Sequence, residues 1–347
     1  MNPACGNAEK IVEYPLKKPL RCCVLLSLAV LVAAPAHAQL NGENLLGDNG
    51  VKSGSQPAPG FYMSALYYLY NTDTIKDRDG NRVTPDPTQA GSQTIQVVTP
   101  VFTYVSRAKL LGAHYGIMAV VPMASGSLEA PGFGFGEDVS VGAADIYLVP
   151  FQLGWHTPRA DVITAFALYA PTGRYTQGAS DNLGKNMWSY ELSAGTTLYF
   201  DEKKTLSVAA TGYWETHTRK KGTGNLRIGN LTLTGVKVGQ LMTLEGGLAK
   251  SFLGAAHVGL AYYGQWKMTK DEFGFEATLP GLPGIGKHRV WGFGPDVTLP
   301  IAAKSKLISL VNVRYLWETG AQLKTQGESL VVTATFPVPS IKIPPTK

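Results

Sequence analysis

Charged residues are scarce in this sequence, since Asp, Glu, Lys and Arg make up 16% of its 347 residues, against about 25% in an ordinary soluble domain. Glycine is frequent, with 39 residues, and so is tyrosine, with 16. So few charges argue against a disordered chain, which needs charge to stay expanded. The length fits one domain, because barrels of this size are common.

Cysteine is nearly absent: Cys5, Cys22 and Cys23 are the only three, and all lie near the start. The first long apolar run, from Cys22 to Ala34, follows three basic residues and precedes Ala36-His37-Ala38, a small-x-small cleavage site. We therefore expect residues 1–38 to be an export signal cut before Gln39. Cleavage would remove every thiol, which excludes a disulfide framework and a cysteine metal site.

Two other readings of this start fit less well. A transmembrane anchor needs roughly 18 to 20 apolar residues, and this run is shorter and ends at Pro35. A lipoprotein signal needs a small residue before its cysteine, whereas Arg21 and Cys22 occupy those positions. Cleavage of the signal would remove four basic and two acidic residues and leave 27 basic and 23 acidic residues in the mature chain. This excess is too small and too scattered to indicate nucleic-acid binding.

Long apolar runs are missing after Ala38, so a membrane-embedded form of this chain must be built from strands that close on themselves. Segments with a period of two recur from Phe61 onward, separated alternately by long polar stretches and tight turns. They predict an all-β, transmembrane, antiparallel up-and-down barrel of about 12 strands over 61–337. The strands are expected at 61–71, 93–106, 110–123, 143–155, 161–175, 187–200, 205–217, 239–252, 256–268, 288–301, 306–318 and 328–337.

The connections between these strands sort by length. Tight turns are expected near Arg107, His156, Glu202, Gly254 and Lys304, and the long loops cover 72–92, 124–142, 176–186, 218–238, 269–287 and 319–327. Such alternation predicts periplasmic turns on one side and external loops on the other. Residues 39–60 are expected to be irregular and too short to fold as a plug, and 338–347 to form a tail.

Alternation within single strands separates two faces. In 206–215, Leu206, Val208 and Trp214 share one register, and Ser207 and Glu215 share the other. The first register suits lipid and the second a wet lumen. A soluble sandwich also alternates, but its loops would not sort into long and short ones. An aromatic girdle is predicted where tryptophans end apolar registers, at Trp155, Trp188, Trp214, Trp266 and Trp317.

The last strand places Leu330, Val332, Ala334 and Phe336 on one register. This spacing is similar to the terminal pattern by which bacterial outer-membrane proteins meet their assembly machinery, which would be a partner of this chain. The tail beyond Pro337 departs from that pattern, which ends at the aromatic residue.

Several short motifs carry a family resemblance. They are Pro57-Ala58-Pro59-Gly60-Phe61-Tyr62, Leu111-Gly112-Ala113-His114-Tyr115-Gly116, Asp145 with Pro150 and Gly154-Trp155-His156, Tyr169-Ala170-Pro171-Thr172-Gly173-Arg174-Tyr175, and Gly292-Phe293-Gly294-Pro295-Asp296-Val297. The sequence thereby resembles the outer-membrane family of putative meta-pathway phenol-degradation proteins, also described as SphA-like. The resemblance implies a barrel in the outer membrane of a Gram-negative bacterium, associated with uptake of aromatic or other hydrophobic compounds. It implies no catalytic residues.

Polar side chains on the inner register are the candidates for lining a pore. The charged ones are Glu191, Glu215, Glu245, Lys250, Lys267, Asp296, Arg314 and Glu318, and the tyrosines are Tyr62, Tyr213 and Tyr263, with Tyr68, Tyr70 and Tyr104 on the same predicted register. Aromatic rings offer an apolar solute a flat face beside a hydroxyl. The alternative is that the charges pair and the rings only fill a lumen of intermediate width.

Signs of catalysis are weak. Ser189, Ser193 and Ser207 are expected to face inward, and His217, His257 and His288 are available, but no nucleophile elbow or metal-ligand spacing appears. We expect no cofactor and no enzymatic activity. Basic residues in one long loop suit lipopolysaccharide phosphates, or are simply solvated: Arg219, Lys220, Lys221, Arg227 and Lys237.

The sequence thus predicts a passive channel for small hydrophobic or aromatic compounds. An outer-membrane enzyme acting on lipid, and a structural or adhesive barrel without transport, remain the alternatives.

Overall fold

The computed structural model describes residues 40–83, 91–130, 135–177, 179–222, 226–228, 231–252, 256–273, 286–303 and 306–338. The predicted signal at 1–38, the turns near Gly254 and Lys304, and residues 339–347 of the predicted tail lie outside these ranges. Within them, no helix is long and apolar enough to cross a membrane. The strands are β1 (Gly60–Thr72), β2 (Ser92–Leu110), β3 (Ala113–Val120), β4 (Met123–Ala130), β5 (Phe135–Ala143), β6 (Ile146–His156), β7 (Ala160–Ala170), β8 (Ser189–Tyr199), β9 (Leu206–His217), β10 (Leu226–Ile228), β11 (Leu231–Leu233), β12 (Leu241–Phe252), β13 (Ala256–Lys267), β14 (Arg289–Ala303), β15 (Lys306–Gln322) and β16 (Glu328–Val338).

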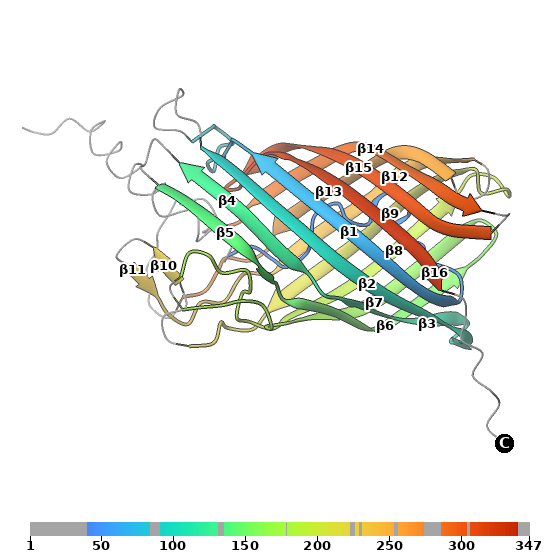
Figure 1. Cartoon of the computed structure of the whole chain (residues 1–347), viewed down its shortest axis with the longest axis horizontal. Helices are drawn as coiled ribbons and strands as arrows, with labels where there is room; N and C mark the ends of the chain where they lie inside the picture. The colour runs from blue at the N-terminus through green and yellow to red at the C-terminus, as the bar shows by residue number, and fades with distance from the viewer. Residues whose placement is uncertain are drawn as a thin grey trace, which may run out of the picture.

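Twelve of these strands close into an antiparallel barrel, as the sequence predicts (Figure 1). Each pairs with its neighbour in chain order, and β1 pairs with both β2 and β16, so the ring has no open edge. The tight connections gather at one end, here called the turn end, and the long ones at the other, here called the loop end. Closure satisfies the backbone hydrogen bonds of the wall from within the chain.

The wall differs from the prediction between residues 107 and 146. The tight turn expected near Arg107 lies at Leu111–Gly112, because β2 continues to Leu110. The predicted strand 110–123 is interrupted at Pro122, which cannot donate a backbone hydrogen bond. The predicted loop 124–142 is the hairpin of β4 and β5, which extends the wall at the loop end (Figure 1).

Two further differences concern a strand that is shorter than predicted and a loop that contains strands. The predicted strand 161–175 ends at Ala170, because Pro171 follows. The predicted loop 218–238 contains the short hairpin of β10 and β11. Neither difference changes the number of strands in the ring.

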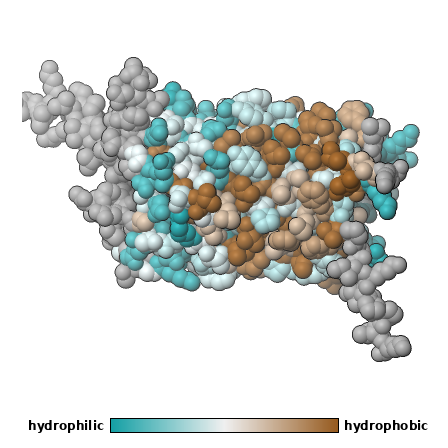
Figure 2. Space-filling view, viewed as in Figure 1, coloured by the Kyte–Doolittle hydropathy of each residue, from teal (hydrophilic) through white to brown (hydrophobic). Residues whose placement is uncertain are grey.

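Alternation along the strands separates an outer and an inner face. Leu192, Leu248, Leu260 and Phe293 are exposed on the outside, and Figure 2 shows apolar side chains gathered over the barrel wall, with hydrophilic ones toward the loop end. Four tryptophans are exposed on this outer face near the loop end: Trp188, Trp214, Trp291 and Trp317. Trp155 lies at the turn end, where its ring nitrogen donates to the Leu111 carbonyl at 3.1 Å.

The segment before β1 runs inside the barrel. Residues 40–59, here called the luminal segment, form one short 3-10 turn, Gly50–Lys52, and are otherwise irregular. Leu40 is buried against Leu241 near the loop end, and Gly60 opens β1 at the turn end. The stretch folds into no plug domain, but it occupies the lumen as an irregular chain, a path that the sequence did not predict.

Candidate functional site

Seven of the eight charged candidates face the interior. They are no more than 8% exposed and come from β8 to β15: Glu191, Glu215, Glu245, Lys267, Asp296, Arg314 and Glu318. They are here called the charged arc. Lys250 does not belong to it, because it is exposed and shares a register with Leu248. It lies five residues after Glu245, an odd separation that places it on the opposite face of the strand.

The tyrosine candidates divide in the same way. Tyr62 lies on the inner register near the turn end, where its hydroxyl donates to the Ala58 carbonyl at 2.8 Å. Tyr213 and Tyr263 are buried in the interior, as are Tyr68 and Tyr70. Tyr104 is 44% exposed and therefore faces outward, while its neighbour Val105 is buried. The prediction for Tyr104 is wrong by one residue of register.

Carboxylates of the charged arc accept hydrogen bonds from the main chain of the luminal segment. Glu215 accepts from the Glu43 amide at 2.6 Å. Glu245 accepts from the amides of Gly47 and Asn49, at 2.7 and 3.2 Å. The wall therefore holds the segment by its backbone.

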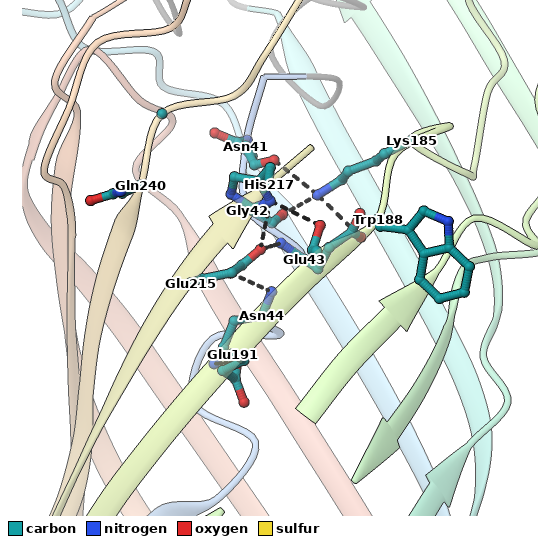
Figure 3. A network of polar contacts seen from close by, with 12 residues as sticks. Asn41, Gly42, Glu43, Asn44, Lys185, Trp188, Glu191, Glu215, His217 and Gln240 are labelled. Carbon is teal, nitrogen blue, oxygen red and sulfur yellow. Dashed lines mark hydrogen bonds and ion pairs between the residues drawn. The ribbon is translucent and has the colours of Figure 1, made fainter. Parts of the chain in front are cut away.

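Lysines at the loop end bind the carbonyls of the same segment. The Lys267 ammonium donates to the Leu40 carbonyl at 2.7 Å, and Lys185 donates to the carbonyls of Asn41 and Gly42 and lies 3.5 Å from the Glu43 carboxylate. Figure 3 shows Lys185, from the loop before β8, and Glu215, from β9, approaching this stretch from different sides, with Trp188 turned away. The start of the segment is thus fixed through both its carbonyls and its amides.

Burial also changes the charge of two loop-end lysines. It lowers the pKa of Lys220 to about 7, and it lowers the pKa of Lys324 to about 8. The Lys220 ammonium donates to the Lys185 carbonyl at 2.6 Å, and Lys324 donates to the Gln265 side chain at 2.6 Å. Part of the positive charge at this end is therefore lost near neutral pH.

An ion pair fixes the middle of the lumen. Arg314 lies 2.8 Å from the Asp296 carboxylate and donates to the Gly47 carbonyl. Asp296 also accepts from the Val51 amide at 3.2 Å. Gly50 has a φ of +64°, and a Cβ atom there would overlap the Arg314 guanidinium. Only glycine fits this position, since both the backbone angle and the space exclude a side chain.

Near the turn end, Asp161 anchors the segment. Its carboxylate accepts from the hydroxyls of Ser55, at 2.9 Å, and Tyr199, at 2.6 Å, and lies 3.2 Å from the Lys204 ammonium. Just above, the Gln56 amide donates to Gln152 at 3.1 Å. These contacts link the segment to β8 and, beyond the charged arc, to β6 and β7.

The other half of the lumen is hollow. An outer cavity of about 320 Å³ lies at the loop end between Asn41–Leu46 and β1, β2 and β4. An inner cavity of about 330 Å³ lies deeper. Its wall residues from β1, β2 and β3 carry no charge and are here called the neutral arc: Ser64, Leu66, Val97, Thr99, Val101, Met118 and Val120.

The segment thus divides the lumen into a bound side and a free side. Tyr147 and Tyr169, whose ring centroids lie 4.5 Å apart, continue the free side along β6 and β7. Sequence reasoning missed this division and the anchoring residues Asp161 and Lys185. The Gly- and Asn-rich stretch 41–50 was the available signal, because it can follow an irregular path with its amides free to donate.

The enzymatic alternative gains little from the structure. Ser189 and His217 do meet, with 2.8 Å between the hydroxyl and Nδ1. Glu215 lies 3.5 Å from the same nitrogen, whereas a relay needs a carboxylate on the other one. Ser189 is fully buried, so a lipid could not reach it. Within the described ranges, no cluster of side chains has the composition of a metal site.

The loop cations predicted to meet lipopolysaccharide are partly engaged. Arg219 lies 2.6 Å from Glu272, and Lys237 lies 3.5 Å from the same carboxylate. Both basic side chains remain partly exposed at the loop end. The side chain of Arg227 lies outside the described part of the structure.

Similar structures are outer-membrane barrels. The COG4313 outer membrane channel from Pseudomonas putida F1 has a TM-score of 0.68 at 14% identity, covering 85% of this chain and 100% of that chain. The translocator domain of the autotransporter NalP from Neisseria meningitidis has a TM-score of 0.48 at 13% identity, covering 89% and 100%. The first comparison shows that the chain has the fold of an outer-membrane channel.

Sequence comparison gives the family. No curated protein sequence matches the chain at a significant level. Residues 72–334, most of the barrel, match the family described as putative MetA-pathway of phenol degradation. The chain belongs to this family.

Proposed function

We propose that the barrel is a passive outer-membrane channel for small, uncharged and largely apolar solutes. The solute enters at the loop end, passes the outer and inner cavities along the neutral arc, and leaves at the turn end toward the periplasm. No energy source is needed, because the solute follows its own gradient.

The division of the lumen carries this proposal. Three carboxylates of the charged arc, those of Glu215, Glu245 and Asp296, accept hydrogen bonds from the luminal segment and line neither cavity, so they hold this segment and do not face a passing solute. The free side offers the apolar side chains of the neutral arc and tyrosine rings, with acidic residues of the segment and of the opposite wall at its border. A pore for anions would need cations around the free space, whereas none of the residues that line the inner cavity is basic.

The comparisons support the solute class. The similar structure from Pseudomonas putida F1 is named a channel, and the family is described by phenol degradation. An aromatic ring suits the inner cavity, because tyrosine faces can stack on it and their hydroxyls can meet a polar substituent.

The test uses the full-length protein in vesicles with lipopolysaccharide in the outer leaflet, here called LPS vesicles. That leaflet slows apolar solutes, so entry of a radiolabelled aromatic solute reports on the protein. Val101→Trp fills the inner cavity from β2, and Leu260→Trp adds the same bulk on the lipid-facing side, where Leu260 is 61% exposed.

We expect Val101→Trp to abolish protein-dependent entry and Leu260→Trp to leave it unchanged. Equal entry with all three proteins would refute passage through the inner cavity. Lipid turnover that is lost in Ser189→Ala, in the absence of solute entry, would favour the enzyme instead.

Export and surface contacts belong to the same proposal. We infer cleavage before Gln39, insertion by the outer-membrane assembly machinery, and contact of Arg219 and Lys237 with lipopolysaccharide phosphates at the loop end. Mass spectrometry of the purified protein tests the first point: a mature chain that begins elsewhere than Gln39 would refute it.

A further inference from the structure

Three consecutive residues of the luminal segment point to different parts of the lumen. The Asn44 side chain donates to Glu191 at 3.3 Å. Leu46 is buried in a cluster with Tyr263 and Leu316, on the side of the charged arc. Leu45 faces the free side, where it packs against Tyr68 and its apolar neighbours.

The two cavities meet at Leu45. Five residues border both the outer and the inner cavity: Glu43, Asn44, Leu45, Val97 and Ala144. Val97 belongs to β2 and Ala144 to the connection between β5 and β6, so the segment supplies the other side of this boundary. A solute that moves from one cavity to the other must therefore pass between the segment and the wall at this level.

Leu45 differs from the other two segment residues at this boundary. Glu43 lies 3.5 Å from Lys185, and the side chain of Asn44 is hydrogen-bonded to Glu191, so moving either side chain breaks a polar contact. The Leu45 side chain has no polar atom, packs against the cluster around Tyr68, and is partly exposed. A change of rotamer there breaks no hydrogen bond.

The backbone beneath Leu45 is fixed. The amides of Glu43 and Asn44 donate to Glu215, and the Gly47 amide donates to Glu245. The main chain therefore stays in place while the leucine side chain can turn.

We propose that Leu45 determines which solutes pass, by setting the width of the opening between the outer and the inner cavity. The inference rests on the proposed channel function, and it assigns size selection to one side chain of the luminal segment opposite Val97. Solutes narrower than the opening pass with the leucine in place. Wider solutes pass only after the Leu45 side chain has changed rotamer.

Substitution tests the assignment with a series of neutral aromatic solutes of increasing width in LPS vesicles. Leu45→Ala should raise the entry of the widest solute by about tenfold, with little change for the narrowest. Leu45→Trp should reduce entry of every member. Val51→Ala is the matched control, because Val51 lies in the same segment but packs against the charged side.

A second measurement separates a change of width from a change of fold. Because the three cysteines all precede residue 24, Leu45→Cys carries the only thiol of a chain cleaved before Gln39. A bulky disulfide-forming reagent, added to the folded protein, should block entry, and a reductant should restore it. Val51→Cys, buried at 1% exposure, should react far more slowly.

The outcomes distinguish this inference from the channel itself. Suppose that Val101→Trp blocks entry, so that the channel stands. The role of Leu45 is then refuted if every Leu45 variant keeps the same dependence of entry on solute width. It is also refuted if entry continues after complete modification of Leu45→Cys, as judged by mass spectrometry. If the unaltered protein gives no more entry than Val101→Trp, the channel proposal fails first.

Discussion

Asp296 is buried among three donors that come from different parts of the chain. They are the Arg314 guanidinium at 2.8 Å, the Asn312 amide at 2.6 Å and the Val51 main-chain amide at 3.2 Å. A buried charge is tolerated when it is paired and its remaining lone pairs are satisfied. Asp296 therefore binds both the wall and the luminal segment, so a substitution in the wall at this position also affects the contacts of the segment.

Removal of the cationic partner of Asp296 should therefore reduce the stability of the barrel. We expect Arg314→Met to lower the free energy of unfolding by about 3 to 5 kcal/mol, because it leaves the Asp296 carboxylate buried without a cation. Arg314→Met combined with Asp296→Asn should recover part of this loss. Urea unfolding of the detergent-solubilised barrel measures both.

Lys250→Met provides the matched control, since it also removes a basic side chain but from the exposed outer register. It should change the free energy of unfolding by less than about 0.5 kcal/mol. Equal losses in Arg314→Met and Lys250→Met would contradict the importance of the buried pair.

Among the elements, the hairpin of β2 and β3 shows how turn geometry overrides a local pattern. Its turn residues, Leu111 and Gly112, have φ values of +53° and +80°. Two positive φ angles are typical of a type I′ turn, which favours Asn-Gly. Leucine is strained in this region, and its side chain is 81% exposed, so it gains little from burial.

We expect Leu111→Asn to stabilise the barrel by about 1 kcal/mol, because asparagine tolerates the left-handed region. The hydrogen bond from Trp155 uses the main-chain carbonyl and survives the substitution. Gly112→Ala should destabilise the barrel by a similar amount, because alanine is strained at a positive φ that glycine adopts freely. Urea midpoints that move in the same direction for both variants would argue against strain as the cause.

Across the whole molecule, the distribution of charge predicts which solutes are rejected. The residues around the inner cavity include four carboxyl groups, those of Glu43, Asp48, Asp145 and Glu191, and none of these lining residues is basic. An anionic solute there would lose hydration water and meet carboxyl groups but no cation, and burying an unpaired charge is costly.

A neutral solute should therefore enter faster than its anion. We expect protein-dependent entry of benzyl alcohol into LPS vesicles at pH 8 to exceed that of benzoate by at least about tenfold. Subtracting the entry measured with Val101→Trp removes passage through the lipid. Faster entry of benzoate would contradict the rejection of anions at the inner cavity.

The elements of the barrel could be predicted from the sequence to different degrees. Inner and outer faces were correct for strands such as β8, β9 and β15, because alternation is a property of each strand alone. Lys250 and Tyr104 were misplaced because a slip of one residue reverses the face. The β4–β5 hairpin was taken for a loop, since its polar and glycine-rich residues resemble one.

What the sequence determined by itself is the closed, lipid-facing wall and the side of each strand that turns inward, since both follow from a period of two and from the alternation of long and short connections. Only the tertiary structure decided where the luminal segment runs and which half of the lumen stays open. The contacts that hold it join residues 172, 198 and 245 positions apart, to Glu215, Glu245 and Asp296. No local pattern encodes such contacts, because they arise only when the closed sheet brings the side chains of distant strands around one irregular segment.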